Sequence, residues 1–225
     1  MTKIPRCIGI ILDGNRRWAR EKGLLTLEGH RKGLENLKQI ARVTRDAGIS
    51  NLVVYAFSTE NWNRPPKEVS YLMGMLERAA QEEFAELLQE NIRIRFAGER
   101  KGLSDRTRRT IEKIEEESAK NNAMTLWVLF SYGGRMEIVQ ATQELSKRGE
   151  EITENAISKY LWTNGMPDPD IIVRTGGEKR LSNFLPWQGV YSELFFVKQY
   201  WPDFTEKDLL AVLEEFKTRE RRMGV

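Results

Sequence analysis

An aspartate and two arginines stand directly after an apolar run near the start of the chain, in the sequence GIILDGNRRWA at residues 9–19. A carboxylate such as that of Asp13 is a ligand that Mg²⁺ takes one or two at a time, beside water and phosphate oxygens. Arg16 and Arg17 offer forked donors that suit phosphate oxygens. The same aspartate can instead cap a helix that begins near Asn15, and the two roles can coexist.

Four more polar loops follow apolar runs further along the chain, with the sequences STENWNR (58–64), AGER (97–100), SYGGR (131–135) and RTGGEKRLSN (174–183). Together the five loops carry these donors: Arg16, Arg17, Arg64, Arg135, Arg174, Arg180, Asn15, Asn61, Ser58, Ser182 and the backbone amides of Gly133, Gly134, Gly176 and Gly177. Any one of these arginines can be a solvated surface charge. Six of them at predicted strand ends indicate a ligand rich in phosphate oxygens, and diphosphate fits.

The elements that must position these loops follow from the apolar pattern. Short runs rich in β-branched or aromatic residues predict strands at 7–12, 51–57, 93–97, 125–130, 171–173 and 193–197. Apolar residues at three- and four-residue spacing predict helices at 33–48, 67–90, 104–121, 134–147, 153–163 and 205–219. This alternation predicts an α/β fold, a single domain over residues 1–225 with a mostly parallel central sheet of about six strands flanked by helices. The carboxyl ends of parallel strands meet at one edge, so the polar loops should converge there.

The predicted helix at 67–90 has a wide apolar face, which includes Leu72, Met73, Leu76, Phe84 and Leu87. Spacing alone favours packing against the core. Beside a phosphate-binding edge, the same face can also line a slot for a long apolar ligand, and a hydrophobic tunnel is part of the expected fold.

Composition narrows the function classes. Hydrophobic residues make up 40% of the chain and charged residues 31%, with a net charge of +3. A nucleic-acid partner is not expected, because such proteins usually show a basic stripe. The single cysteine, Cys7, excludes a disulfide within the chain and a metal site with several cysteines, and it favours a cytoplasmic location. The single histidine, His30, excludes a metal site rich in histidine. No run approaches the roughly 18 apolar residues of a membrane span.

Several catalytic motifs are missing from the sequence. There is no G-x-x-x-x-G-K-[ST], no complete G-x-G-x-x-G after the first predicted strand, no H-E-x-x-H and no D-D-x-x-D. Nucleotide hydrolysis and the chemistry of trans-prenyl synthases are therefore not supported.

The order of the remaining blocks resembles the cis-prenyltransferases, the isoprenyl diphosphate synthases of the undecaprenyl diphosphate synthase type. These blocks are DGNRRWA, GHRKG, YAFSTENWNRP, SYGGR, RTGGEKRLSNFLPWQ with YSELFF, and WPDF, and they span nearly the whole chain. The resemblance implies an enzyme that condenses isopentenyl diphosphate with an allylic prenyl diphosphate, adds cis isoprene units and releases pyrophosphate. Its product would be a polyprenyl diphosphate, a precursor of lipid carriers.

The resemblance also implies roles for individual residues. Asp13 matches a catalytic aspartate that holds Mg²⁺, and Asn61 an asparagine proposed to act in proton removal. The matched substrate-binding residues are Gly14, Asn15, Arg16, Arg17, Trp18, Thr26, His30, Ser58, Thr59, Glu60, Trp62, Arg64, Arg174, Arg180, Leu181 and Ser182. Arg174, Arg180 and Ser182 match the isopentenyl diphosphate site. Glu193 matches a second Mg²⁺ ligand, supplied by the same subunit or by the partner of a homodimer.

Some positions depart from the family pattern. Many bacterial members have glycine at Arg16 and histidine at Lys179, and an arginine is often found at Thr26. These departures leave the identity of the allylic primer undetermined, but they do not change the expected reaction. The C-terminal Arg222–Gly224 resembles an R-x-G end that reaches a neighbouring active site in some members. Peripheral contact with a membrane surface is expected to be transient at most.

Two other functions remain compatible with the sequence. The chain can be a non-catalytic partner subunit, although such relatives lack the complete DGN and RTGGE blocks. It can also be a magnesium-dependent phosphohydrolase that uses Asp13 as its nucleophile.

Overall fold

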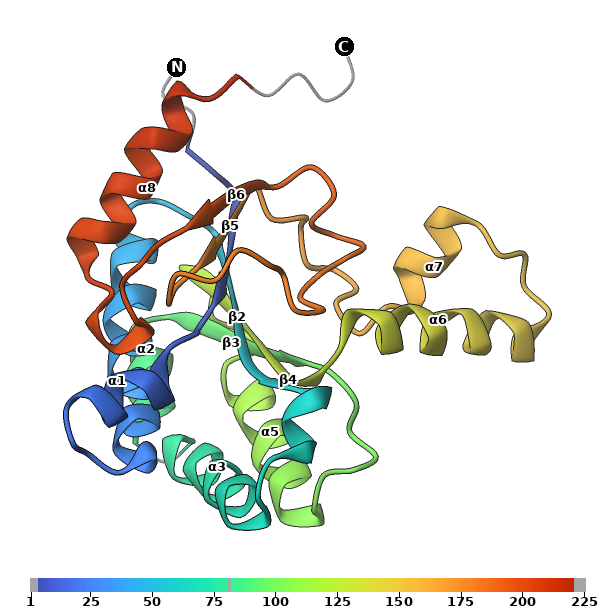
Figure 1. Cartoon of the computed structure of the whole chain (residues 1–225). Helices are drawn as coiled ribbons and strands as arrows, with labels where there is room; N and C mark the ends of the chain where they lie inside the picture. The colour runs from blue at the N-terminus through green and yellow to red at the C-terminus, as the bar shows by residue number, and fades with distance from the viewer. Residues whose placement is uncertain (1–3, 81, 221–225) are drawn as a thin grey trace.

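The computed structural model describes residues 4–80 and 82–220 of the chain (Figure 1). Its centre is a six-stranded sheet in the order β3-β4-β2-β1-β5-β6, and all neighbouring strands in it are parallel. The strands are β1 (Cys7–Ile11), β2 (Asn51–Ser58), β3 (Ile92–Ala97), β4 (Met124–Tyr132), β5 (Ile171–Arg174) and β6 (Glu193–Phe196). The six predicted strands are confirmed, each to within two residues at either end.

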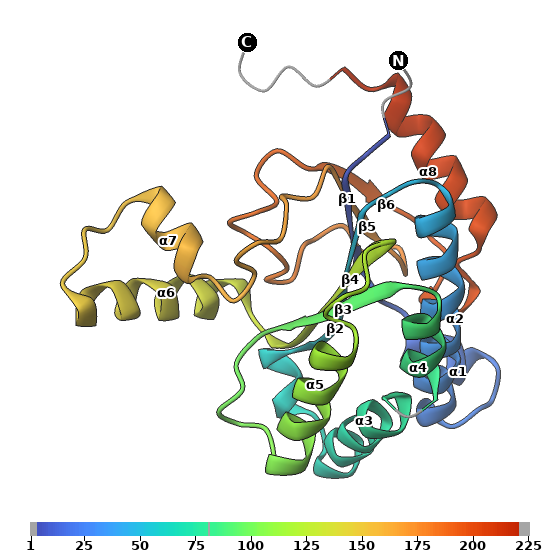
Figure 2. The ribbon, with the colours of Figure 1, turned by 180° about the vertical axis from the view of Figure 1, so that it is seen from behind.

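The helices are α1 (Asn15–Glu21), α2 (Thr26–Asp46), α3 (Pro66–Ala79), α4 (Glu83–Gln89), α5 (Asp105–Glu117), α6 (Gly134–Arg148), α7 (Glu154–Tyr160) and α8 (Glu206–Thr218), with 3₁₀ turns η1 (Thr59–Asn63) and η2 (Trp201–Asp203). Figure 1 shows α2, α3, α5 and α8 gathered around one side of the sheet, and Figure 2 shows α4 among them. Of the described residues, none lies in a helix that is both long enough and apolar enough to cross a membrane.

Both faces of β1, β4 and β5 are buried almost throughout, which explains why these strands read as nearly continuous apolar runs. On β1, Ile8 and Ile10 belong to the larger core that the helices cover. Cys7 and Ile11 point the other way, into a smaller core completed by Phe184 of the long segment between β5 and β6. Side chains alternate between the faces of a strand, so one short strand supplies both cores.

The prediction of a single helix at 67–90 is wrong. Helix α3 ends at Ala79 and α4 begins at Glu83, so the apolar face is divided between two helices. The division lets the short α4 turn its own apolar side toward the edge strand β3, where the Phe84 ring meets the Phe96 ring edge-on with centroids 6.2 Å apart. Burial of Phe84 against the sheet outweighs continuation of the helical pattern, and no glycine or proline marks the end of α3.

The first two helices also differ from the prediction. Helix α2 starts at Thr26, about two turns before the predicted start at residue 33. Helix α1 was expected only as a turn that begins near Asn15, and it extends to Glu21. Glycines are unfavourable inside helices, so Gly23, Gly29 and Gly33 do not favour a helix that begins before residue 33. Gly29 and Gly33 are instead needed inside α2, since α1 packs directly on them: a Cβ at Gly29 would overlap the carbonyl oxygen of Asn15.

Helices α6 and α7 form an arm that projects away from the sheet (Figures 1 and 2). The base of the arm is held by a fully buried carboxylate, Glu137, whose Oε2 accepts a 2.6 Å hydrogen bond from the Tyr132 hydroxyl. The other oxygen accepts from the amide and the hydroxyl of Thr163 at 2.9 and 2.8 Å. This network ties the arm to the end of β4 and to the segment that follows α7.

Candidate active site

Asp13 stands at the carboxyl end of β1, where the chain turns into α1. Gly14 has φ of 110°, and a Cβ there would come within 2.5 Å of the Tyr200 ring, so only glycine fits this turn. The carbonyl oxygen of Asp13 accepts hydrogen bonds from the Trp201 amide at 3.0 Å and from the Thr175 hydroxyl at 2.7 Å. Two distant segments therefore fix the backbone that carries the carboxylate.

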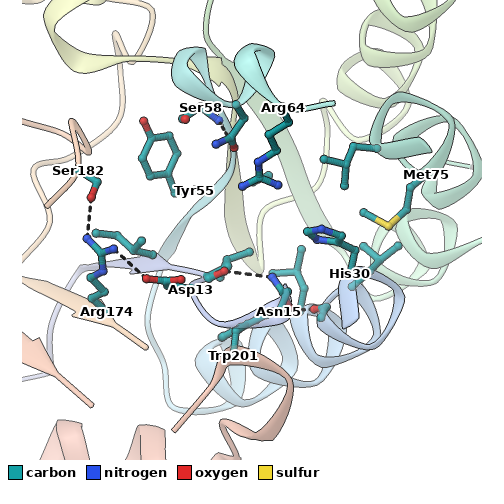
Figure 3. A pocket seen from close by; sticks show the side chains of 18 of the residues that line it. Asp13, Asn15, His30, Tyr55, Ser58, Arg64, Met75, Arg174, Ser182 and Trp201 are labelled. Carbon is teal, nitrogen blue, oxygen red and sulfur yellow. Dashed lines mark hydrogen bonds and ion pairs between the residues drawn. The ribbon is translucent and has the colours of Figure 1, made fainter. Parts of the chain in front are cut away.

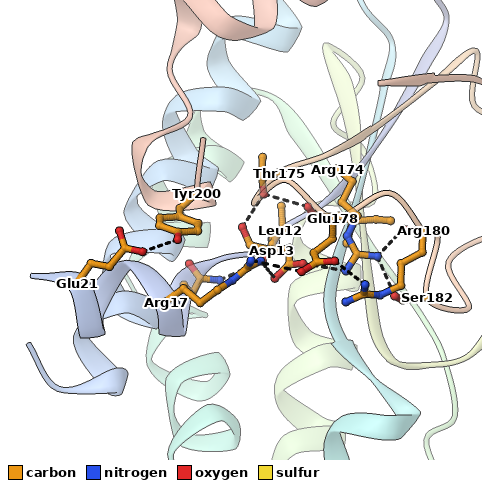
Figure 4. Close-up of polar contacts among 12 residues, drawn as sticks. Leu12, Asp13, Arg17, Glu21, Arg174, Thr175, Glu178, Arg180, Ser182 and Tyr200 are labelled. Atoms are coloured by element: carbon orange, nitrogen blue, oxygen red, sulfur yellow. Dashed lines mark hydrogen bonds and ion pairs between the residues drawn. The ribbon is translucent and has the colours of Figure 1, made fainter. Parts of the chain in front are cut away.

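The Asp13 carboxylate faces arginines and does not cap the helix (Figure 4). One oxygen lies 2.8 Å from Nη2 of Arg174 and the other 3.1 Å from Nη2 of Arg17. The N-cap of α1 is Gly14, and no side chain caps it. The helix-cap interpretation of Asp13 is wrong, because the cations hold its carboxylate away from the helix amides.

Arg174 is the most buried cation of this edge, with 4% of the residue exposed. Its Nη1 donates to the Ser182 hydroxyl at 2.8 Å and to the carbonyl oxygen of Arg180, while Nη2 holds Asp13. The Arg180 side chain is 60% exposed and pairs with Glu178 at 2.5 Å. One buried and one exposed guanidinium thus follow β5.

His30 and Arg64 approach the same space from the helical side (Figure 3). His30 is buried on α2, and Arg64 follows η1. Burial and the Arg64 charge lower the pKa of His30 below its usual value, whereas Glu68, 3.4 Å from Nε2, opposes the shift. Burial also lowers the pKa of Arg64, and Glu68 counters this as well.

Asn61 is oriented by its own turn. The Oδ1 atom of Asn61 accepts the Ser58 amide at 3.0 Å, and the two residues form a capping box around η1. The side-chain amide group, Nδ2, is the part that stays available to a ligand. Asn61 therefore presents donors to the cavity that it lines.

Two cavities meet at these residues. The first, of about 350 Å³, has polar walls that include Asp13, Asn61, Arg174, Arg180 and Ser182, and an apolar end formed by Leu34, Leu37, Leu72 and Met75. The second, of about 580 Å³, is lined by Leu12, Asp13, Gly14, Asn15, Arg16, Arg17, Arg20, Leu24, Thr26, His30 and Arg64. Leu12, Asp13, Asn15, His30 and Arg64 line both cavities. The site is thus a basic bowl joined to a partly apolar pocket through one carboxylate.

Of the described residues that line the two cavities, only Asp13 carries a carboxylate that could bind a metal ion. Across residues 4–80 and 82–220, no cluster of three or more histidine, cysteine, aspartate or glutamate side chains could hold an ion. Mg²⁺ commonly takes one or two carboxylates and completes its shell with phosphate oxygens and water. Asp13, which borders both cavities, fits that requirement only when a substrate supplies the remaining oxygens.

Several predicted site residues do not line either cavity: Trp18, Thr59, Glu60, Trp62, Leu181, Arg135 and Glu193. Trp62 supports the site from behind, since its Nε1 donates to the Ser131 hydroxyl at 3.0 Å and its ring packs on Phe57. Glu60 accepts a 2.8 Å hydrogen bond from Asn183, which links η1 to the segment after β5. These two residues hold the loops that carry the lining residues.

Glu193 lies at the amino end of β6, whereas Asp13 follows the carboxyl end of β1. Its carboxylate pairs with Arg219 of the α8 C-cap at 2.9 Å. The chain does not bring Glu193 to Asp13, so a shared Mg²⁺ within one subunit is not supported. The predicted Arg222–Gly224 contact lies outside the described residues.

Some lining residues were missed from the sequence. Arg20 follows Arg16 by one helical turn on α1, a signal that the unrecognised helix concealed. Tyr55 lines the first cavity from within β2, where a strand aromatic looks like core, and its hydroxyl donates to the Tyr132 carbonyl at 3.1 Å. Trp201 enters through η2, a segment with no strand or helix pattern.

Known proteins resemble the chain over its whole length. A family model described as "Putative undecaprenyl diphosphate synthase" matches residues 11–224. An isoprenyl transferase of Agrobacterium fabrum is 46% identical over 230 residues, covering 99% of this chain and 93% of that protein. An isoprenyl transferase of Thermotoga maritima is 42% identical over 227 residues, covering 99% and 97%.

Solved structures agree. The lavandulyl diphosphate synthase of Lavandula x intermedia, crystallised with dimethylallyl diphosphate, superposes with a TM-score of 0.94 at 34% identity, covering 98% of each chain. A probable undecaprenyl diphosphate synthase of Campylobacter jejuni gives a TM-score of 0.85 at 30% identity, covering 99% of this chain and 100% of that one. With a basic bowl, an adjoining pocket and matches of this extent, the chain belongs to the cis-prenyltransferase family of the undecaprenyl diphosphate synthase type and is an isoprenyl transferase.

Proposed function

We propose that the chain condenses isopentenyl diphosphate with an allylic prenyl diphosphate, releases pyrophosphate and adds cis isoprene units to give a polyprenyl diphosphate. The observation that carries the proposal is the pair of cavities that share Asp13. Each cavity has its own arginines, so two diphosphates can be held on either side of one carboxylate. A single phosphate-binding pocket would suit a hydrolase instead.

The basic bowl is the proposed site of the allylic diphosphate. Arg16, Arg17 and Arg20 line the bowl from α1, and Arg64 lines it from the end of η1. Thr26 also lines the bowl, and the arginines of α1 supply positive charge beside it. The hydrocarbon chain would enter the apolar end of the adjoining cavity, between α2 and α3. A hydrophobic tunnel that extends beyond this apolar end is part of the same proposal.

Isopentenyl diphosphate is proposed to bind beside the end of β5. Arg174 and Ser182 form a fixed pair there, and the exposed Arg180 can turn from Glu178 to an incoming phosphate. Because Arg174 also holds Asp13, the two diphosphate sites share a rigid wall. Such positioning of the two reacting carbons is a large part of what an enzyme supplies for a bimolecular step.

The family generally uses Mg²⁺, and we infer that Asp13 holds it together with oxygens of the allylic diphosphate. When bound, Mg²⁺ would offset negative charge on the departing pyrophosphate. Arg17 and Arg64 face the same region and donate to oxygens on which charge builds up as the carbon–oxygen bond of the primer breaks.

Asn61 is proposed to orient isopentenyl diphosphate rather than to remove its proton. Its acceptor oxygen already receives the Ser58 amide, and a carboxamide is a poor base near neutral pH. The proton lost from the added unit would then pass to a phosphate oxygen. The Asn61 donors fit the task of holding that phosphate in place.

A homodimer is the proposed assembly. The arm formed by α6 and α7 carries two apolar side chains toward solvent, Met136 at 45% exposure and Val139 at 54%. A second copy of the chain that covered this face of the arm would bury both side chains. Cytoplasmic location, with transient contact at a membrane surface to deliver the apolar product, belongs to the same proposal.

The test of the reaction is incorporation of labelled isopentenyl diphosphate with a panel of allylic primers, from dimethylallyl to geranylgeranyl diphosphate, followed by analysis of product length and double-bond geometry. The Asp13→Ala variant should keep its secondary structure and lose turnover by several orders of magnitude. The substitution removes the carboxylate that would hold Mg²⁺ and that contacts both Arg17 and Arg174. Near-normal incorporation by Asp13→Ala would contradict the role of Asp13. Phosphate release from simple monoesters without isopentenyl diphosphate would contradict the reaction.

A further inference from the structure

A buried carboxylate that belongs to none of the loops described above lies behind the basic bowl. Glu68 stands in the first turn of α3, and 10% of its side chain is exposed. Its Oε1 atom lies 3.1 Å from Nη1 of Arg64, 3.4 Å from Nε2 of His30 and 3.8 Å from Nε of Arg16. These three partners come from three different segments: the end of η1, α2 and α1.

All three partners line the bowl, but Glu68 lines neither cavity. A carboxylate is a poor contact for a diphosphate, since both carry negative charge and neither donates a hydrogen bond. The role of Glu68 must therefore be exerted through the residues it holds. One oxygen shared by three partners fixes their distances to one another.

Two of the partners, Arg16 and Arg64, are cations that repel each other, and Glu68 supplies a counter-charge between them. Burial lowers the pKa of Arg64, and the nearby Arg16 charge adds to that effect, while Glu68 acts in the opposite direction. The Arg16 side chain is 55% exposed, and its Nε atom lies 3.8 Å from Oε1 of Glu68, which gives this arginine an anionic partner at the bowl. A buried pair that loses one partner leaves an uncompensated charge, which is strongly unfavourable.

The local backbone suits this role. Pro65 and Pro66 lie between Arg64 and Glu68 and restrict the chain there, and the Glu68 amide donates to the Pro65 carbonyl at 2.9 Å. A negative side chain is also favoured in the first turn of a helix. The carboxylate thus stands at a fixed point relative to η1.

We propose that Glu68 is a positioning residue for the allylic primer: it holds Arg16, His30 and Arg64 in the arrangement that receives the primer diphosphate. This inference rests on the proposed function, and it concerns one of the two substrates. Arg174, Arg180 and Ser182, at the other side of Asp13, pair with residues other than Glu68. His30 and Arg64 border both cavities, whereas Arg16 lines the bowl, so binding of isopentenyl diphosphate should depend on Glu68 less than binding of the primer does.

The sign of the effect distinguishes positioning from simple charge. Removing a negative charge near the bowl makes its potential more positive, which by itself would tighten binding of a diphosphate. Loss of the shared contact would instead let Arg16 and Arg64 move apart and weaken binding. Glu68→Gln keeps the size of the side chain and removes its charge, so the two effects predict opposite results.

The experiment measures KM for the primer and for isopentenyl diphosphate separately, with the primer that the wild-type chain elongates fastest. Calorimetric titration with the same primer and Mg²⁺, without isopentenyl diphosphate, gives binding apart from turnover. For Glu68→Gln we expect the primer KM and Kd to rise about tenfold or more, as for loss of a hydrogen bond to a charged group. KM for isopentenyl diphosphate should change several-fold less than KM for the primer. Glu68→Asp restores the charge but sets the carboxylate one methylene further back, so it should recover only part of the primer affinity.

Glu77→Gln is the matched control. Glu77 lies on the same helix, with 14% of its side chain exposed and Arg106 at 2.8 Å, but it lines neither cavity. It should lower the melting temperature to a similar extent and leave both KM values unchanged. Unchanged or tighter primer binding in Glu68→Gln overturns the inference, and so does an equal loss for both substrates. Failure of the wild-type chain to use any primer would instead overturn the proposed function.

Discussion

The charged residues of the site are paired with one another before any substrate arrives. Asp13 holds Arg174 and Arg17, and Glu178 holds Arg180. Exposed pairs such as Arg180–Glu178 contribute about 0–1 kcal/mol, so a phosphate can replace the glutamate at little cost. Breaking a buried pair by removing one partner costs about 3–5 kcal/mol, which favours a fixed Arg174. The site therefore combines one rigid cation with others that are free to close on a ligand.

Asn61 offers a prediction at the scale of a single atom. Asn61→Asp keeps the oxygen that accepts the Ser58 amide but replaces the Nδ2 donors with negative charge. If Asn61 donates to a phosphate, kcat/KM for isopentenyl diphosphate should fall about 100-fold or more, equivalent to about 2.7 kcal/mol. Steady-state kinetics with a fixed primer measures this.

Asn63→Asp makes the same change in the same turn at an exposed position and should be nearly neutral. Activity of Asn61→Asp equal to or above that of the wild type would contradict the proposed donor role of Asn61.

At the scale of elements, the site depends on how closely α1 lies against α2. Asn15 begins α1, and its backbone and side chain occupy the space beside Gly29 and Gly33, where a Cβ would clash. The other end of this contact is η2: the Trp201 indole donates to the Gly33 carbonyl at 2.7 Å. Helix α2 thus places Asp13 indirectly, by holding the segments on either side of it.

Gly29→Ala tests this packing. The added methyl should force α1 away from α2, lower the free energy of unfolding by about 1–3 kcal/mol and reduce incorporation of isopentenyl diphosphate, because Asn15 and Asp13 move with the helix. Urea unfolding and the incorporation assay measure the two effects on the same preparation.

Gly74→Ala is the control within a helix. Position 74 lies in α3, where a Cβ would meet only Arg78 at 3.5 Å, so alanine should stabilise the protein by about 0.5–1 kcal/mol. Equal behaviour of the two variants would mean that the α1–α2 contact does not constrain the site.

At the scale of the whole molecule, the sheet joins parts of the chain that are far apart in sequence. Strand β1 pairs with β2 on one side and with β5 on the other, so the first and last thirds of the chain share one core. The single domain expected over residues 1–225 stays a prediction, and this pairing favours it. The arm of α6 and α7 is the part that extends away from the shared core (Figure 1).

The proposed dimer gives the prediction at this scale. In light scattering the chain should have a mass of about 52 kDa, twice its 26.2 kDa, because a second copy would bury the apolar face of the arm. The double variant Met136→Lys with Val139→Lys should shift the mass toward the monomer, since lysines are costly to bury.

Leu210→Lys, at a 41% exposed position on α8, is the control and should leave the mass unchanged. A monomeric wild type would contradict the dimer, and a dimeric double variant would place its interface elsewhere.

The amino-acid sequence alone determined the strands, the parallel sheet and the edge at which the polar loops converge. These features depend on local apolar patterning and on the crossover rule, which need no knowledge of distant contacts. The sequence motifs also named Asp13, Arg64 and Arg174, because phosphate binding calls for such side chains after strands.

The tertiary structure alone decided which of those side chains face a cavity. It turned Trp62 and Glu60 into supports for the loops, placed Glu193 away from Asp13 and brought Glu68 behind three donors of the bowl. Helix α1 and the division between α3 and α4 were equally hidden. In each case a contact between segments distant in sequence outweighed a local preference, and such contacts exist only after the chain has folded.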